Sequence, residues 1–435
     1  MRVLVVGGGG REHALVWKLR QSPEVTEIFC APGNAGIRAL ADCVPIEPSD
    51  IVELADFAEK VSIGLTVVGP ELPLILGLVD EFQRRGLAVF GPNRAASELE
   101  GSKAFAKDFL KRHKIPTARY HVVSSMEEAK AVLETSEVGF PLVVKADGLA
   151  GGKGVVIVDG KAEALDVAEK LIENRQLGSA GTRLIFEEFL QGDEVSFFAL
   201  SDGHNVLPLV AAQDHKRALD NDEGPNTGGM GSICPATILN ADTLKYIVKD
   251  VVHPTISGLA AEGRKYQGIL YAGLMLTAEG PKVLEFNVRL GDPEAQALLP
   301  RLKSDLFPLL REVSQGHLGQ HRLEWVREPA VSVVLASGGY PGKYETGKPI
   351  EGLDSGQVEL EEGLYVFHSG TKTENGKLVT SGGRVCAVTG ISHNLKGSIE
   401  RAYEGVERIR FEGRHFRKDI GQKALARLVG KLMGG

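Results

Sequence analysis

The chain has 435 residues, a formal net charge of −7, 43% hydrophobic residues and 25% charged residues. This length predicts about three domains of roughly 150 residues, each able to bury its own core. The mildly acidic balance gives no general attraction for nucleic acid or an anionic membrane surface, so a phosphate ligand has to be held by a local site. Glycine is the one unusual count: 53 residues, against an average usage of roughly 7%. It predicts many tight turns and backbone amides close to ligands.

The four cysteines lie far apart and form neither a C-x-x-C pair nor the spacing of a zinc site. Free thiols in a reducing compartment fit this pattern best. The N-terminal MRVLVVGGGG contains an apolar run too short for a signal-peptide core. No stretch approaches the roughly 18 apolar residues of a membrane span. We therefore expect a cytoplasmic protein with no membrane and no nucleic-acid partner.

The first hundred residues repeat a cycle of short apolar strand, glycine-containing loop and helix. The first strand covers 3–6 and runs into four glycines at 7–10, and further strands are expected over 28–30, 65–68 and 88–90. This alternation predicts an open parallel sheet covered by helices. Ligands of such sheets bind beyond the carboxyl ends of the strands.

The glycine loop at the N-terminus does not match the dinucleotide-binding fingerprint. G-x-G-x-x-G would require glycine at position 12, where the sequence has Glu12. A mononucleotide-like or sugar-phosphate ligand fits these loops better than NAD. Each loop, taken singly, is also explained by a plain turn.

A second glycine-rich loop, in the middle of the chain, joins two predicted strands. Lys145 ends the first strand and Lys153 lies near the end of the loop. It is not a Walker loop, because Asp147 stands in place of the first glycine and Gly154 in place of the final Ser or Thr. Two lysines that flank a glycine loop favour a flap over phosphates rather than a plain hairpin.

Two neighbouring segments can complete a nucleotide site. Ser102 is in position to cap a helix over 103–110. An apolar strand over 184–190 is interrupted and resumes over 195–200, and the hinge between them can offer backbone groups to an adenine edge and Glu194 to a ribose. An interdomain turn with solvated acids is the open alternative.

The stretch KVLEFNVRLGDPE, residues 282–294, alternates as a β-strand does. Leu284, Phe286, Val288 and Leu290 are expected on the core side, and Val283, Glu285, Asn287 and Arg289 on the opposite side. A carboxylate, a carboxamide and a guanidinium two residues apart can hold a hard cation beside an anionic group. A half-exposed strand followed by an ordinary turn is the alternative.

The polar segment 211–232 is long for a loop, and such loops are usually functional or disordered. Its Gly, Pro, Asn and Thr content over 224–229 favours a shaped loop. A β-rich segment is expected from about 329, followed by a helix over 395–409.

Six motifs, in this order along the chain, resemble the phosphoribosylamine–glycine ligase family of the ATP-grasp superfamily. They are VVGGGGREHAL at 5–15, KADGLAGGKGV at 145–155, DHKRALDNDEGPNTGGMG at 214–231, LEFNVRLGDPE at 284–294, ASGGYPGKY at 336–344 and HSGT at 368–371. Gly151, Leu290 and Ser369 depart conservatively from the family pattern.

The resemblance implies an α/β protein with an ATP-grasp fold, an N-terminal open parallel-sheet domain and a C-terminal β-rich domain. The expected bounds are 1–101 for the substrate-binding N-terminal domain, 102–325 for the ATP-grasp domain with a lid at about 119–193, and 326–435 for the C-terminal domain.

The implied reaction joins glycine to 5-phosphoribosylamine with ATP, through glycyl phosphate, and yields glycinamide ribonucleotide, ADP and phosphate in purine biosynthesis. The expected ligands are these small molecules together with Mg²⁺ or Mn²⁺, and the chain is expected to act as a monomer.

The resemblance also implies roles for individual residues. The ATP phosphates are assigned to Lys103, Lys145, Gly151, Gly152, Lys153 and Gly154, and adenine and ribose to Glu187, Phe189, Leu190 and Glu194. Metal ligands are Glu285 and Asn287. Asp214 is assigned to the glycine ammonium and Arg289 to its carboxylate and the acyl phosphate, with Gly291 beside them. Phosphoribosylamine is assigned to Gly8, Gly9, Gly10, Arg11, Gly33, Asn34 and Glu71.

Two other functions remain open from the residues. One is a related ATP-grasp enzyme, such as a purine-pathway carboxylase that acts on bicarbonate. The other is a nucleotide-binding module without turnover, against which the row Glu285, Asn287 and Arg289 argues. The expected preceding strand, at 274–276, supplies no second acid, so a second metal would rest on Glu285, Asn287, ATP and water.

Overall fold

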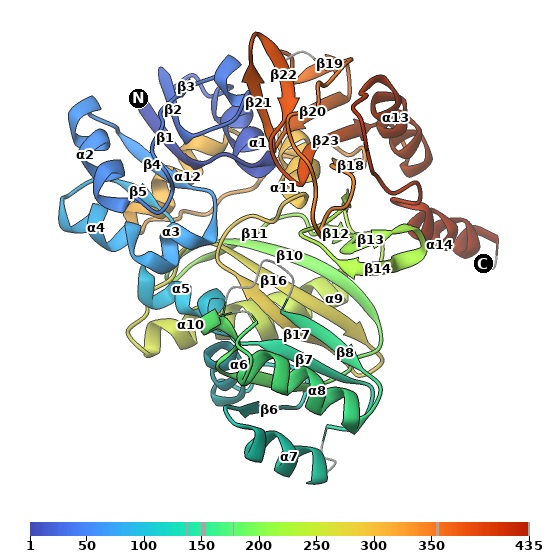
Figure 1. Cartoon of the computed structure of the whole chain (residues 1–435). Helices are drawn as coiled ribbons and strands as arrows, with labels where there is room; N and C mark the ends of the chain where they lie inside the picture. The colour runs from blue at the N-terminus through green and yellow to red at the C-terminus, as the bar shows by residue number, and fades with distance from the viewer. Residues whose placement is uncertain (136–137, 149–153, 177, 354–355, 434–435) are drawn as a thin grey trace.

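The computed structural model of the chain describes residues 1–135, 138–148, 154–176, 178–353 and 356–433. The N-terminal and C-terminal parts form two lobes side by side, and the middle of the chain forms a third lobe below them (Figure 1). The predicted mixed α/β class is confirmed. Gly151, Gly152 and Lys153 lie outside the described residues.

The N-terminal lobe is a five-stranded parallel sheet in the order β3-β2-β1-β4-β5. The open parallel sheet predicted for the first hundred residues is therefore confirmed. Its strands are β1 (Arg2–Gly7), β2 (Glu27–Pro32), β3 (Asp42–Cys43), β4 (Leu65–Val68) and β5 (Val89–Phe90). Its helices are α1 (Gly10–Leu19), α2 (Ile51–Val61), α3 (Glu71–Leu76), α4 (Leu78–Arg84) and α5 (Arg94–Gly101).

The third lobe is built on an antiparallel sheet in the order β11-β10-β16-β17. The strands are β10 (Asp193–Asp202), β11 (Val206–Pro208), β16 (Gln267–Thr277) and β17 (Gly280–Asn287). The helical segments α6 (Lys103–Arg112), α9 (Ala241–Tyr246), a π-helical turn (Ile247–Val252) and α10 (His253–Ala261) belong to the same lobe. Apolar residues of α6, the π-helical turn, α10, β10, β16 and β17 share one buried core with apolar residues of the N-terminal lobe.

A separate small sheet, β6-β9-β7-β8, forms the lid. It consists of β6 (Tyr120–Val123), β7 (Leu142–Ala146), β8 (Val155–Val158) and β9 (Leu184–Glu188), together with α7 (Met126–Thr135) and α8 (Lys161–Ile172). This unit has its own hydrophobic core. Because its core is separate, the lid can shift as one piece relative to the larger sheet.

The C-terminal lobe is centred on a six-stranded sheet, β12-β15-β18-β23-β20-β19. Its strands are β12 (Gln213–Asp214), β15 (Gly231–Cys234), β18 (Ala330–Ala336), β19 (Glu359–Glu361), β20 (Leu364–His368) and β23 (Arg384–Ile391), with α13 (Leu395–Arg408) and α14 (Gln422–Met433). Strand β12 lies within the polar segment 211–232, and β15 begins at the end of that segment. One sheet therefore extends across the boundary expected near 326, and the exact domain bounds stay a prediction.

The polar segment itself folds as a hairpin of β13 (Arg217–Leu219) and β14 (Glu223–Asn226) between β12 and β15. This confirms a shaped loop. The helix cap at Ser102 is also confirmed, because its Oγ accepts the Phe105 N–H at 3.1 Å. Helix α13 ends one residue before the predicted bound. No helix among the described residues is long and apolar enough to cross a bilayer.

The faces predicted for 282–294 are wrong in part. Strand β17 ends at Asn287, and its pairing with β16 shifts between Val283 and Glu285, which leaves Leu284 as an extra residue. Val283 is therefore buried in the same core as Phe286 and Val288, whereas Leu284 lines a cavity. A β-bulge reverses the side of every residue before it, and simple alternation does not reveal one.

The N-terminal and C-terminal lobes meet along α1 and β20. The Trp17 ring makes edge contacts with Tyr365 and Phe367 at centroid distances of 5.4 and 5.9 Å. Nearby, the buried His13 accepts the backbone N–H of His368 on Nδ1 at 2.8 Å. This packing presses the glycine loop before α1 against the C-terminal lobe.

Gly390 tests the packing of the C-terminal lobe, because α13 lies directly on β23 there. A Cβ at this position would lie 2.4 Å from the Ala402 nitrogen and 2.5 Å from the Ser398 oxygen. We expect Gly390→Ala to lower the free energy of unfolding by about 1–3 kcal/mol through overpacking, measured by thermal and urea denaturation. Gly319→Ala is the control, since the closest atom to its Cβ would be at 3.5 Å. Equal stability of the two variants would contradict this account of the α13–β23 contact.

Candidate active site

A cavity of about 790 Å³ lies where the three lobes and the lid meet. Its walls come from the end of α5, α6, the lid strands β7 and β9, the hinge before β10, the segment 213–228, β17 with the turn after it, and α14. The carboxyl ends of several strands and a hinge therefore face one space. Most of the site residues predicted from the sequence lie on these walls.

At the lid end of the cavity, three charged side chains form a buried row. Lys107 donates to Glu187 Oε1 at 2.6 Å and to the Thr117 hydroxyl at 2.7 Å. Lys145 Nζ lies 2.5 Å from Glu187 Oε2 as an ion pair. Burial lowers the pKa of Lys107 to about 8 despite the opposing charge of Glu187. Because both its oxygens face lysines, Glu187 orients Lys145 toward the cavity, where Lys103 also lies.

The hinge after β9 supplies the outer wall. Phe189 and Leu190 line the cavity, and Leu190 is buried. Asp193 at the start of β10 is held by Arg427 of α14 at 2.5 Å, so the C-terminal helix closes over the hinge. Glu194, beside it, is exposed on the cavity side.

Glu285 and Asn287 lie on the same wall as Arg289, as predicted. Lys216 Nζ lies 3.2 Å from both Glu285 Oε1 and Glu194 Oε2. Its charge lowers the pKa of Glu285 to about 2 in spite of burial, so this carboxylate is ionised at neutral pH. An ionised carboxylate and a carboxamide are oxygen ligands of the kind that Mg²⁺ and Mn²⁺ prefer.

The two protein oxygens would not be enough for a metal on their own. Among the described residues, no group of three or more His, Cys, Asp and Glu side chains is arranged to hold a metal ion. Gly273 stands opposite Glu285 on β16, which agrees with the absence of a second acid expected from the sequence. Further ligands would have to come from a bound phosphate and water.

Arg289 is held by two carboxylates of the N-terminal lobe. Its Nε donates to Glu71 Oε2 at 3.0 Å, its Nη2 to Glu100 Oε1 at 2.9 Å and its Nη1 to the Leu290 carbonyl at 3.3 Å. Glu100 also accepts the Val288 N–H at 2.7 Å. Burial raises the pKa of Glu100 to about 7, whereas Arg289 and Arg11 outweigh burial and lower the pKa of Glu71 to about 2. The guanidinium is thus fixed in direction before any ligand binds.

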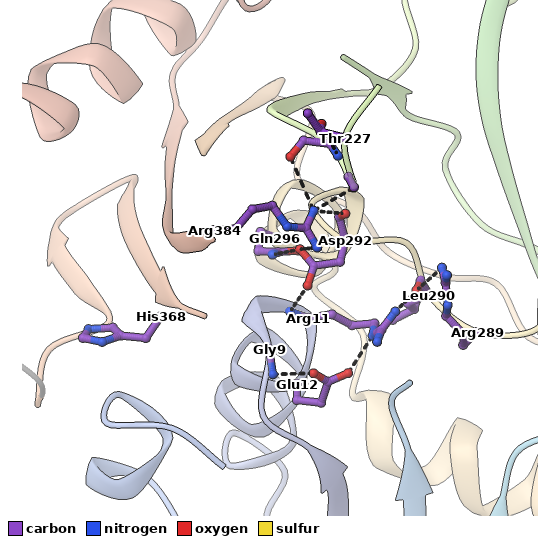
Figure 2. Close-up of polar contacts among 12 residues, drawn as sticks. Gly9, Arg11, Glu12, Thr227, Arg289, Leu290, Asp292, Gln296, His368 and Arg384 are labelled. Atoms are coloured by element: carbon purple, nitrogen blue, oxygen red, sulfur yellow. Dashed lines mark hydrogen bonds and ion pairs between the residues drawn. The ribbon is translucent and has the colours of Figure 1, made fainter. Parts of the chain in front are cut away.

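Two backbone N–H groups at the glycine loop and the start of α1 donate hydrogen bonds to carboxylates of the protein. Gly9 N–H donates to Glu12 at 2.6 Å, and the backbone N–H of Arg11 donates to Asp292 at 3.3 Å (Figure 2). The Arg11 side chain in turn bonds Glu12 Oε1 at 2.6 Å and the Leu290 carbonyl at 2.9 Å. The donors that a phosphate would need at this loop are partly used within the protein.

Asn34, in the loop after β2, connects this loop to the glycine loop before α1 and to the C-terminal lobe. Its Nδ2 donates to the carbonyls of Gly8 and His368, both at 2.9 Å, and its Oδ1 accepts the Ile37 N–H. Gly8, Gly9, Gly10, Gly33 and Asn34 therefore lie at the junction of the N-terminal and C-terminal lobes, and none of them lines the large cavity. Their assignment to phosphoribosylamine stays a prediction.

Arg384 of the C-terminal lobe reaches into the cavity and was not predicted. Its Nη1 donates to the carbonyls of Gly228 at 2.7 Å and Asp292 at 2.6 Å, and its Nη2 lies 3.5 Å from the Asp292 carboxylate (Figure 2). The Gln296 side-chain amide also donates to Asp292 Oδ1, at 2.7 Å. Arg384 lies within the β-rich segment expected from about residue 329, in which no site residue was predicted.

Asp214 and Glu294 lie together on the cavity wall. Glu294 is 2% exposed, and its Oε1 accepts the Ser196 hydroxyl at 2.9 Å. Burial, and after it the negative charge of Glu294, raises the pKa of Asp214 well above its usual range. The sequence suggested Asp214 but treated Glu294 only as the end of a turn.

Among the predicted residues, Lys103, Lys145, Gly154, Glu187, Phe189, Leu190, Glu194, Asp214, Glu285, Asn287, Arg289, Gly291, Arg11 and Glu71 line the cavity. The polar residues missed from the sequence are Glu100, Lys107, Lys216, Asp292, Glu294 and Arg384. Asp292 and Glu294 stand within the recognised GDPE motif, and Lys216 within DHKR. Glu100, Lys107 and Arg384 are far from Arg289 in sequence and have no local signal.

Comparison with known proteins gives matches over nearly the whole chain. Three family models match: the phosphoribosylglycinamide synthetase N domain over residues 1–100, its ATP-grasp (A) domain over 101–295 and its C domain over 330–423. A protein of Allochromatium vinosum named phosphoribosylamine–glycine ligase is 51% identical over 430 residues, which cover 98% of this chain and 99% of the relative.

Solved structures agree with these matches. The crystal structure of phosphoribosylamine–glycine ligase from Thermotoga maritima has a TM-score of 0.83 and 36% identity, and the match covers 97% of this chain and all of that chain. The biotin carboxylase domain of 2-oxoglutarate carboxylase from Hydrogenobacter thermophilus has a TM-score of 0.74 over 95% of this chain and 91% of that chain. Its 18% identity shows a shared fold alone.

The predicted ATP-grasp fold is thus confirmed, as is the resemblance drawn from the six motifs. Three family models match the chain, and its identity with named family members extends over nearly its full length. This chain belongs to the phosphoribosylamine–glycine ligase family.

Proposed function

We propose that this protein ligates glycine to 5-phosphoribosylamine with ATP, as a step of purine biosynthesis. The observation that carries the proposal is one cavity lined by two lysines, by the Glu285–Asn287 oxygen pair and by the Arg289 guanidinium. These groups suit a phosphate chain, a cation and an activated carboxylate. Catalysis in such a site is mainly positioning and neutralisation of charge.

The reaction has two steps. A carboxylate oxygen of glycine attacks the γ-phosphorus of ATP, the bond to the β-phosphate oxygen breaks, and ADP leaves glycyl phosphate behind. The amine of phosphoribosylamine then attacks the glycyl carbonyl carbon, phosphate leaves with the C–O bond electrons, and the new amide nitrogen loses a proton. Arg289 and Asp214 would be the protein groups beside the reacting atoms, with Gly291 at the turn next to them.

Residues at the lid end would hold ATP. Lys103 and Lys145 are proposed to bind phosphate oxygens, together with Gly151, Gly152, Lys153 and Gly154, the residues assigned to the ATP phosphates from the sequence. Phe189, Leu190 and the hinge backbone would hold adenine, and Glu194 the ribose. Glu187 would act through the lysines it contacts, because Lys107 and Lys145 occupy its two oxygens.

Glu285 and Asn287 would hold Mg²⁺ or Mn²⁺. Their fit is supported by the low pKa of Glu285, which keeps the carboxylate charged, and by the position of both side chains between the lysines and Arg289. A bound divalent cation supplies neutralisation of the phosphate charge. The protein's own part is to orient the triphosphate and the carboxylate toward each other.

Phosphoribosylamine would enter from the N-terminal lobe, where Arg11 and Glu71 line the cavity. The working unit is proposed to be a monomer. An enzyme that draws on ATP and a labile sugar amine is expected in the cytoplasm, and the four free cysteines are in keeping with that compartment.

Product analysis tests the function directly. We expect ADP release that requires both glycine and phosphoribosylamine, with glycinamide ribonucleotide detected by mass spectrometry. Phosphate release that depends on bicarbonate and not on glycine would overturn the proposal in favour of a carboxylase. ATP binding without any turnover on this substrate set would favour a binding module.

Arg289→Lys tests the role of the guanidinium while it keeps a positive charge between Glu71 and Glu100. An ammonium cannot copy the planar fork that holds two carboxylates and a carbonyl. We expect kcat to fall by about 100-fold or more, with the Kd for ATP within about threefold of the wild-type value. Stopped assays for ADP and calorimetry with a non-hydrolysable ATP analogue measure the two quantities.

The control for this variant is Arg408→Lys, at an exposed arginine that pairs with Glu361. Alanine at 289 is less informative, because it would leave two buried carboxylates without their cation and could unfold the site. Glycine-dependent ADP production at the wild-type rate by Arg289→Lys would reject the assigned role.

Glu285→Gln tests the metal assignment. Loss of the one charged ligand should raise the Mg²⁺ or Mn²⁺ concentration needed for half-maximal activity by at least about tenfold. Metal titrations at saturating ATP measure the change. Glu279→Gln, at an exposed carboxylate paired with Lys282, should leave the metal requirement unchanged. An unshifted titration for Glu285→Gln would place the metal elsewhere.

A further inference from the structure

We infer that Asp147 is a positioning residue for the ATP phosphates: it joins the chain directly after β7 to the first turn of α6, and so fixes Lys103 relative to Lys145. The inference rests on the proposed function, which assigns both lysines to the phosphate chain, and extends it by a residue that acts through them. In the sequence, Asp147 served only to exclude a Walker loop. Its contacts in the fold give it a role of its own.

One oxygen of the Asp147 carboxylate caps α6. Asp147 Oδ1 accepts the Ser102 hydroxyl at 2.9 Å and the Ala104 N–H at 2.8 Å. The backbone carbonyl of Asp147 also accepts the Lys103 N–H at 3.1 Å. The first N–H groups of a helix have no partner within the helix and need one from outside. At α6, two of these groups find their partner in a residue that follows a strand of the lid.

The other oxygen of the carboxylate is held within the lid. Arg183, directly before β9, donates from Nη2 to Asp147 Oδ2 at 2.5 Å, and its carbonyl accepts the Asp147 N–H at 3.1 Å. Asp147 is 7% exposed, so water competes little for these contacts. Hydrogen bonds between charged groups are stronger than those between neutral groups. One buried carboxylate therefore spans the boundary between the lid and α6.

Asp147 and Glu187 attach the lid to α6 at two points. Glu187 of β9 contacts both Lys107 of α6 and Lys145 of β7. One contact alone would leave the lid free to pivot about it, and the second restricts that movement. Lys145 stands two residues before Asp147, and Lys103 is the first residue of α6. The two contacts therefore also set the separation of the two lysines assigned to phosphate.

The side chain of Lys103 is held at the same place. Its Nζ donates to the carbonyl of Gly148, the residue after Asp147, at 3.1 Å. Burial lowers the pKa of Lys103, and the charge of Glu285 opposes that shift. An ammonium group has three N–H donors, and among the described residues only the Gly148 carbonyl accepts one of them. Movement of the backbone at 147–148 would redirect the donors that remain for phosphate oxygens.

The test compares a ligand that has a phosphate chain with one that has none. The dissociation constants (Kd) of a non-hydrolysable ATP analogue, with Mg²⁺, and of adenosine are measured by titration calorimetry. For Asp147→Ala we expect the Kd of the analogue to rise by about 10-fold or more, because Lys103 and Lys145 lose their fixed separation. The Kd of adenosine should stay within about twofold of the wild-type value, since adenosine carries no phosphate for the lysines.

Asp305→Ala is the matched control. Asp305 caps α12 (Leu306–Gln315), where it accepts the Phe307 N–H at 3.0 Å and the Ser22 hydroxyl at 2.7 Å. It is not among the described residues that line the cavity. Both alanine variants lose a helix cap and a hydroxyl contact, so we expect both to melt at a lower temperature than the wild type. Only Asp147→Ala should weaken binding of the analogue.

Ser102→Ala keeps the Asp147 carboxylate and removes its hydroxyl partner. The same change takes away the acceptor of the Phe105 N–H, so the first turn of α6 is held less firmly. We expect the Kd of the analogue to rise by about 3–10-fold, with the Kd of adenosine within about twofold of the wild-type value. Circular dichroism melts verify folding, and Ser102→Ala decides the question if Asp147→Ala does not fold.

The outcomes separate this inference from the function on which it rests. If the wild-type protein forms no glycinamide ribonucleotide, the proposed function fails, while the binding measurements still judge Asp147. If Asp147→Ala binds the analogue as tightly as the wild type, or loses affinity for analogue and adenosine by the same factor, the inference is wrong. Either result in Ser102→Ala overturns it where Asp147→Ala does not fold. An equal loss of analogue binding in Asp305→Ala also overturns it, as a general effect of a lost cap.

Discussion

The carboxylate of Asp292 is the point where the three lobes are joined. It accepts hydrogen bonds from the Arg11 N–H of the N-terminal lobe and from the Gln296 amide four residues further along the chain, and it forms an ion pair with Arg384 of the C-terminal lobe. Burial would raise the pKa of Asp292, but Arg384 and Arg11 outweigh it and keep the carboxylate charged. Asp292 follows Arg289 by three residues. The contacts between lobes therefore also fix the orientation of the cavity wall that carries Arg289.

The cavity is organised as a series of matched charges. Lys107 and Lys145 lie on Glu187, Lys216 on Glu194 and Glu285, and Arg289 on Glu71 and Glu100. Each pair holds its members in one direction, so little reorganisation is needed when a charged substrate arrives. Among the described residues that line the cavity, Asp214, Glu294 and Lys103 form no ion pair.

Sequence patterns predicted these features unevenly. The parallel sheet, the Ser102 cap, strand β8 and helix α13 depend on local apolar spacing and capping, and all were predicted closely. Alternation failed at Leu284, because a bulge depends on how β16 pairs with β17. The glycine loop before α1 suggested a phosphate site, yet its amides face Glu12 and Asp292, the latter about 280 residues away.

The sequence by itself determined the family, the order of the elements and most residues of the cavity, because six motifs carry their chemistry within short spans. Only the tertiary structure decided which charges meet. Glu100, Lys107 and Arg384 become site residues through contacts between segments far apart in the chain, and Glu294 gains its meaning from Ser196, about 100 residues earlier. Such pairings depend on how the lobes pack, and a linear pattern of residues does not record that packing.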